Sequence, residues 1–90
     1  MVTQLFEIVC TNFYTSPFDG CISHTTKVVA VCSTKNKAIS MLKRIAGDPS
    51  CEGVIEARYD EELEMTYIKN RWGYNTEYRI EDIILDEWID

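Results

Sequence analysis

One segment of the chain has a clear helical pattern, and strand-like segments lie on both sides of it. On a helical wheel, the apolar residues of positions 38–46 fill one arc and the polar residues fill the opposite arc. Ser33 or Thr34 is a suitable N-cap, and Gly47 followed by Pro49 favours termination of the helix. The pattern predicts one amphipathic helix that packs across a sheet. Its apolar arc consists of Ala38, Ile39, Met41, Leu42, Ile45 and Ala46.

Two β-rich runs precede this helix. The run 5–14 alternates in polarity, and the run 25–32 is almost continuously apolar at its end. Between them, the segment 16–20 contains Pro and Asp-Gly, which are typical turn residues. We therefore expect a long hairpin with a ten-residue loop. The residues on one side of the first strand are Phe6, Ile8 and Cys10.

The part of the chain after the helix also favours strands. The segment 52–60 fits both a helical spacing and an alternating one, and Gly53 at its start favours a strand. The runs 63–69 and 76–84 alternate in polarity, and the segment 70–75 between them has turn composition. The order of elements is thus ββαβββ, with two or three strands following the helix.

Length and composition fit a single α+β domain over residues 1–90, with an antiparallel sheet of four to five strands and one helix on one face. An apolar fraction of 46% excludes a disordered chain. No apolar run approaches the roughly 18 residues of a membrane span, and a secretory signal is lacking, so we expect a cytoplasmic protein. The uncovered face of such a sheet exposes aromatic residues and is often an interaction surface.

The cysteines favour reduced thiols rather than a disulfide framework. Cys10, Cys21, Cys32 and Cys51 form no C-x-x-C pair, and the chain has apolar residues enough for a core. A turn near Cys21 would place Cys10 opposite Cys32. Cys21 and His24 have the spacing of metal ligands but make only half a site, so we expect no metal and no cofactor. The alternative is a small-ligand or metal domain that adds Cys51 to this pair.

No combination of residues indicates an enzyme. His24 is the one histidine, and no nucleotide-binding glycine loop is present. Asp60, Glu62 and Glu64, followed by Lys69, have a spacing compatible with a two-metal nuclease, but nothing else in the sequence supports that chemistry. We therefore predict a non-enzymatic protein without catalytic residues.

The net charge of −6 is unevenly distributed. Residues 1–50 have five basic and three acidic side chains, a net charge of +2, whereas residues 51–90 have four basic and twelve acidic ones, a net charge of −8. The acidic clusters are interpreted either as a solvated surface or as a surface that docks on a basic partner. The candidate partner-binding residues are Asp60, Glu61, Glu62, Glu64, Glu81, Asp82, Asp86 and Glu87, with Trp72 and Tyr74 as aromatic anchors.

The segment 78–88, Tyr-Arg-Ile-Glu-Asp-Ile-Ile-Leu-Asp-Glu-Trp, resembles the closing strand of a family of small uncharacterised bacterial and phage domains. The segment 28–34, leading into Ala38 and Ile39, resembles their strand-to-helix junction. The resemblance implies a strand, strand, helix, strand order and no particular activity, and the acidic stretch between Asp48 and Asn75 departs from it. Size and acidity are also similar to those of phage-encoded anti-CRISPR proteins.

Two functions follow as hypotheses. The first is a phage or mobile-element inhibitor, acting in the host cytoplasm, that occupies a basic nucleic-acid-binding surface of a CRISPR effector or other defence nuclease. In this hypothesis, carboxylates spaced about 6.5–7 Å apart along one face of a strand imitate the phosphates of a nucleic acid. The alternative is an adaptor or homodimeric interaction domain that uses a β-edge or sheet face. Direct nucleic-acid binding through Lys37, Lys43 and Arg44 is disfavoured by the net charge of −6.

Overall fold

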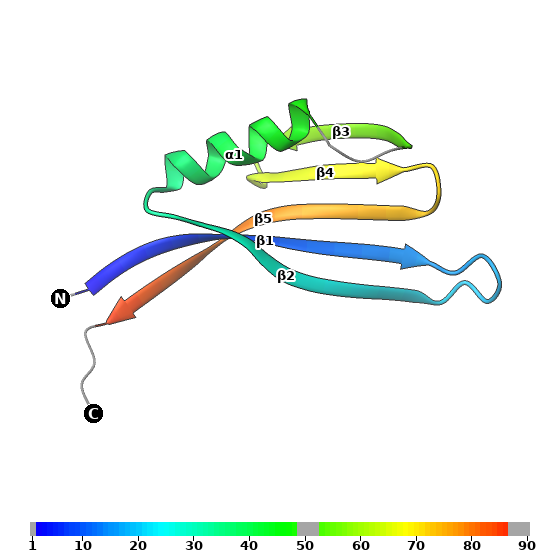
Figure 1. Cartoon of the computed structure of the whole chain (residues 1–90), viewed down its shortest axis with the longest axis horizontal. Helices are drawn as coiled ribbons and strands as arrows, with labels where there is room; N and C mark the ends of the chain where they lie inside the picture. Colours follow the sequence, from blue (N-terminus) through cyan, green and yellow to red (C-terminus); the bar gives the residue numbers. More distant parts are fainter. Residues whose placement is uncertain (1, 49–52, 87–90) are drawn as a thin grey trace.

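The computed structural model describes residues 2–48 and 53–86, and side chains for 4–48 and 53–84. It confirms the α+β fold and the ββαβββ order (Figure 1). The elements are β1 (Val2–Thr15), β2 (Ile22–Cys32), α1 (Lys35–Gly47), β3 (Val54–Asp60), β4 (Met65–Asn70) and β5 (Tyr74–Asp86). The segment with ambiguous periodicity is therefore a strand, as predicted.

The five strands form one antiparallel sheet in the order β2-β1-β5-β4-β3. The long strands β1 and β5 occupy the middle, so β2 and β3 are the two edges. The pairing of β1 with β5 extends to Val2 and Asp86, whereas β2 begins to pair with β1 only at Phe6. The outer ends of β1 and β5 therefore project as a two-stranded ribbon beyond α1 (Figure 1).

Local capping defines the ends of α1. The side chain of Thr34 is the N-cap, and its Oγ1 accepts a hydrogen bond of 3.2 Å from the backbone N–H of Lys37. At the other end, the backbone N–H of Asp48 donates to the carbonyl of Arg44 at 3.0 Å. Gly47 is thus the last helical residue rather than the first residue beyond the helix. No helix within the described ranges is long and apolar enough to cross a membrane.

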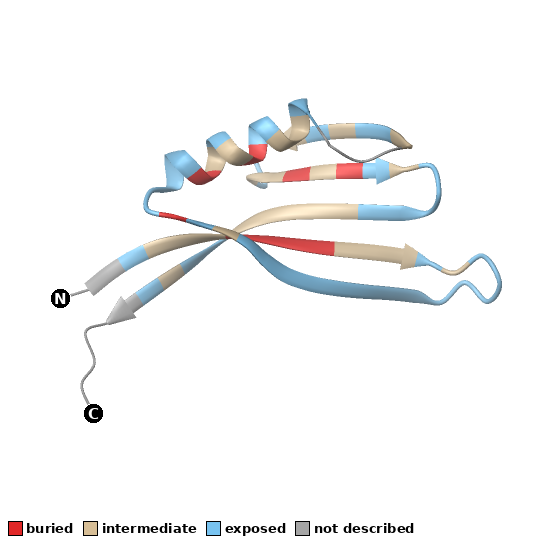
Figure 2. Ribbon diagram, in the orientation of Figure 1, coloured by how far each residue is buried: buried red, intermediate tan, exposed pale blue. Residues whose placement is uncertain are grey.

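The core lies between α1 and one face of the sheet. Its buried members are Ile8, Cys32, Ala38 and Leu42 (Figure 2). A polar contact ties α1 to β4, because the buried hydroxyl of Thr66 donates to the backbone carbonyl of Leu42 at 2.7 Å. The predicted apolar arc is confirmed as the face that α1 turns towards the sheet. Partly buried residues around the core are Phe6, Ala30, Met41, Tyr59, Tyr78 and Ile80.

The β1–β2 hairpin is tighter than predicted. Its loop spans six residues, 16–21, and a backbone hydrogen bond of 2.8 Å joins the first and last of them. Because the chain reverses before Cys21, Cys10 pairs with Lys27 and Cys32 pairs with Phe6. The expectation that Cys10 and Cys32 lie opposite each other is therefore wrong, although both are buried.

Candidate functional site

The first acidic cluster lies in a turn rather than along a strand. Residues 61–64 link β3 to β4, and Asp60 is the last residue of β3. The Asp60 carboxylate accepts hydrogen bonds from the backbone N–H groups of Glu62 and Leu63, at 2.9 and 3.0 Å. Glu64 completes the reversal with a positive φ of 52°. The strand spacing predicted for Asp60, Glu62 and Glu64 is therefore wrong, because a side-chain-stabilised turn reverses the chain there.

Strand pairing brings the second acidic cluster to the same end of the sheet. The pairing of β4 with β5 ends at Met65 and Arg79, and Glu81 and Asp82 follow in β5 beyond it (Figure 1). On the other side of β5, Glu7 of β1 is paired directly with Glu81. We call the set formed in this way the acidic end. It consists of Glu7, Asp60, Glu61, Glu62, Glu64, Glu81 and Asp82.

Three carboxylates of the acidic end are already neutralised by cations of this chain. The ion pairs are Lys35 Nζ–Glu64 Oε2 at 3.0 Å, Arg58 Nη1–Asp60 Oδ2 at 3.7 Å and Arg79 Nη2–Glu81 Oε1 at 3.1 Å. Among the described residues, no cation is paired with Glu7, Glu61, Glu62 or Asp82. Glu61, Glu62 and Asp82 are exposed and Glu7 is half-buried. Four carboxylates therefore remain available to a partner.

The pairing of Glu7 with Glu81 places two like charges directly opposite each other. Such a cross-strand pair destabilises a sheet by several tenths of a kcal/mol, roughly 0.2–1. Arg79 offsets part of this repulsion through Glu81, and its second Nη donates to the Thr11 hydroxyl at 2.9 Å. Arg79 is therefore held towards Glu81 and Thr11, and the Glu7 carboxylate lacks a counter-ion of its own within the described residues.

The two predicted aromatic anchors lie away from the acidic end. Trp72 and Tyr74 belong to the β4–β5 turn and the start of β5, at the opposite end of β4, and about half of each is exposed. Trp72 packs on Gly53, where an added Cβ would come within 2.6 Å of its ring, and Arg71 lies over it at 4.9 Å. Tyr74 contacts Tyr14, with ring centroids 4.7 Å apart. The structure therefore does not unite these aromatic residues with the carboxylates.

Two predicted partner-binding residues are at the C-terminal side of β5. The backbone of Asp86 pairs with Val2, and the Asp86 side chain lies outside the described part of the chain. Glu87 lies outside the described residues altogether. Among the described side chains, the candidate surface therefore consists of the carboxylates of the acidic end.

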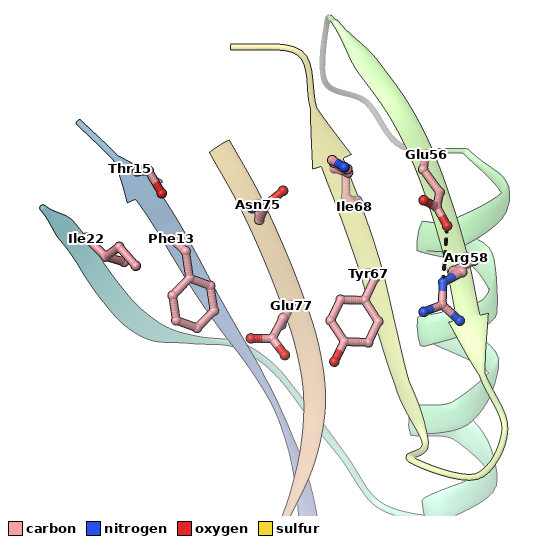
Figure 3. Close-up of a pocket in the computed structure, with 10 residues that line it drawn as sticks. Phe13, Thr15, Ile22, Glu56, Arg58, Tyr67, Ile68, Asn75 and Glu77 are labelled. Atoms are coloured by element: carbon pink, nitrogen blue, oxygen red, sulfur yellow. Dashed lines mark ion pairs between the residues drawn. The ribbon is translucent and has the colours of Figure 1, made fainter. Parts of the chain in front are cut away.

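A second feature, which the sequence interpretation missed, is a hollow of about 510 Å³ on the face of the sheet opposite α1. Figure 3 shows the Glu77 carboxylate between the rings of Phe13 and Tyr67, which come from β1 and β4. Burial and then the charge and hydrogen bond of Glu77 raise the pKa of the Tyr67 hydroxyl. Arg58 lies over the Tyr67 ring at 5.4 Å and also pairs with Glu56 at 3.2 Å. The charges here are balanced among the lining residues, so this hollow has no excess charge to attract an ion.

The pair considered as half of a metal site lies on the β1–β2 hairpin. Cys21 and His24 are both exposed, and the His24 ring packs near Phe13 with centroids 6.1 Å apart. In the parts of the chain that the structure describes, no group of three or more His, Cys, Asp or Glu side chains could hold a metal ion. Cys51 lies outside those parts.

Comparisons of the chain with protein-family models, with curated proteins and with solved structures found no match. At the acidic end, strand pairing gathers more carboxylates than the cations of the described residues pair with.

Proposed function

We propose that this chain is a small, non-enzymatic binding protein whose acidic end docks on a basic, nucleic-acid-binding surface of another protein. A phage or mobile-element inhibitor of a host defence nuclease, of the anti-CRISPR type, is the role that such a surface suits best. The observation that supports this proposal is the gathering of the unpaired carboxylates of Glu7, Glu61, Glu62 and Asp82 at one end of the sheet.

The chemistry of the partner follows from the charge. Nucleases of the RNA-guided class hold nucleic acid in channels lined by Lys and Arg. Carboxylates form short, charge-assisted hydrogen bonds with Arg, and complementary charge raises the rate of association. Because residues 61–64 form a turn, the contact is a compact projection that enters a basic groove, and not an extended line of phosphate-like charges.

The like-charge pair adds a second argument. Residues that violate a local stability rule are expected at functional sites, where a partner compensates the cost. An Arg or Lys side chain placed beside Glu7 and Glu81 would neutralise the repulsion between their carboxylates. Docking through the acidic end would then stabilise the protein as well as occupy the partner.

The test compares two triple variants against one probe, a purified RNA-guided nuclease loaded with its guide RNA. The first, Glu61→Gln with Glu62→Gln and Asp82→Asn, removes unpaired carboxylates of the acidic end. The second, Asp48→Asn with Glu56→Gln and Glu77→Gln, removes the same charge elsewhere. Binding is measured by calorimetry at salt concentrations between about 50 and 200 mM, where exposed charge pairs are progressively screened.

We expect the first variant to bind at least tenfold more weakly and to lose most of its salt dependence, whereas the second retains nearly the wild-type affinity. The same ranking is expected for inhibition of DNA cleavage. Equal affinities for the two variants, or wild-type binding that does not respond to salt, would overturn the proposal. So would the absence of wild-type binding across a panel of such nucleases.

A further inference from the structure

Within residues 2–48 and 53–86, the strand β2 leaves one side of its backbone without a strand partner. It pairs with β1 along its other side and stands at the edge of the sheet. Its 11 residues extend over about 36 Å, and every residue from Ile22 to Val29 is exposed. Unpaired N–H and C=O groups in such a row are a template for pairing with another strand.

The other edge of the sheet is protected. The strand β3 has seven residues, carries Glu56, Arg58 and Asp60, and contains an irregularity between Val54 and Glu56. Short length, charges and bulges are the devices by which proteins prevent edge pairing. Over its 11 residues β2 has one charge, Lys27, and one irregularity in its register with β1. It also exposes apolar side chains, with Ile22 67%, Val28 50% and Val31 55% exposed.

The distribution of charge indicates which strand pairs with this edge. The chain has a net charge of −6, yet no Asp or Glu occurs between Asp19 and Asp48. Two copies that meet through β2 therefore keep their carboxylates out of the contact. An antiparallel edge is also self-complementary, because a two-fold axis presents the same donors and acceptors from both strands.

We propose that two copies of this chain pair through β2, antiparallel about a two-fold axis near Thr25, to form one continuous sheet. This register places Ile22 opposite Val28 of the second copy and Lys27 opposite Ser23. Ile22 and Val28 both point to the face of the sheet opposite α1. Their partners in β1 are Thr15 and Val9, which alternate along that strand with residues that face α1. The pairing joins apolar side chains to each other and separates the two Lys27 ammonium groups.

The dimer is independent of the proposed function. The acidic turn 61–64 lies between β3 and β4, at the opposite side of the sheet from β2. Glu7 pairs with Val31, outside the segment 22–28 that the two copies share. A dimer thus leaves both acidic ends exposed, and each proposal can fail without the other.

The first experiment measures molar mass by light scattering and by sedimentation over a wide range of protein concentrations. We expect wild type to show twice the mass of one chain, and Val28→Lys to weaken the dimer at least tenfold by placing charge in the contact. Ile55→Lys is the matched control, because Ile55, at 62%, is somewhat more exposed than Val28, at 50%, but lies on β3. Circular dichroism and thermal unfolding show whether each variant is folded.

The second experiment traps the register. In a background of Cys21→Ser and Cys51→Ser, Thr25→Cys should form a disulfide-linked dimer under mild oxidation. Residues directly opposed in an antiparallel pair have Cα atoms about 4.5–5.5 Å apart, which a disulfide can span. Lys27→Cys in the same background is the control, because the proposed register puts its two copies roughly 13 Å apart along the strands.

Wild type with the mass of one chain at every concentration would overturn the proposal, and β2 would then be an edge open to a different strand. A Val28→Lys variant that dimerises as wild type does would also overturn it. Linkage through Lys27→Cys with none through Thr25→Cys would exclude the proposed register.

Discussion

The two faces of this sheet are made by alternate residues of the same strands, yet they differ in what they contribute. On the face under α1, Ile8 is completely buried, as is Leu42 of the helix that covers it. The opposite face carries the hollow with Glu77, the Arg58 ion pairs and the like-charge pair of Glu7 and Glu81. The face under α1 therefore packs against the helix, whereas the opposite face buries Val9 and Thr11 but also carries charges that cost stability.

The largest expected effect tests the covered face. Leu42→Ala removes a fully buried side chain at the centre of the helix–sheet contact. We expect a loss of about 2–5 kcal/mol in the free energy of unfolding, measured by urea denaturation. Ile55→Ala, at an exposed position, should change it by no more than about 0.5 kcal/mol. Similar losses in both variants would show that burial under α1 does not dominate stability.

An intermediate effect concerns the polar contact within the covered face. Thr66→Val keeps the shape of the side chain but leaves the Leu42 carbonyl without its buried hydroxyl donor. The expected loss is about 0.5–1.5 kcal/mol, the net contribution of one intramolecular hydrogen bond, because the Leu42 carbonyl lies within α1 and keeps its intrahelical donor. Thr76→Val is the comparison, since the Thr76 hydroxyl donates to Asn12 in a less buried place. If Thr66→Val is as stable as wild type, this contact does not fasten α1 to β4.

The smallest effect has the opposite sign and tests the uncovered face. Glu7→Gln removes the repulsion between Glu7 and Glu81, so we expect a gain of about 0.2–1 kcal/mol. The gain should shrink as added salt screens the charges. Glu77→Gln, whose carboxylate interacts with Tyr67, is the control and should bring no gain. A Glu7→Gln variant less stable than wild type would mean that Glu7 is not strained by its neighbour.

Much of the fold was predictable because its signals are local. The Thr34 cap and the apolar arc of 38–46 specify where α1 begins and which face it buries. Alternation likewise identified strands after the helix, and Gly53 decided the ambiguous segment 52–60 in favour of a strand, which the structure shows from Val54 to Asp60. The turn 61–64 was missed because its charged residues also fit strand alternation. The Asp60 side chain, which bonds to two backbone N–H groups, decides in favour of the turn.

The candidate site was only partly predictable. Glu61, Glu62 and Asp82 were selected because they lie in acidic runs. Glu7 was not selected, because it stands alone in an apolar strand and becomes part of the acidic end only through its pairing with Glu81. Phe13 and Tyr67, which line the hollow, were also not predicted as site residues, because they come together only through strand pairing. Alternation in β1 does place Phe13 on the face opposite Ile8.

The elements and their order follow from local signals, since periodicity, caps and turn residues act within a few positions along the chain. Long-range strand pairing places β1 and β5 in the middle of the sheet and leaves β2 at an edge. Those outcomes depend on backbone hydrogen bonds between segments from opposite ends of the chain, and a local pattern does not encode which strand will be its neighbour. The acidic end and the open β2 edge both arise from that pairing.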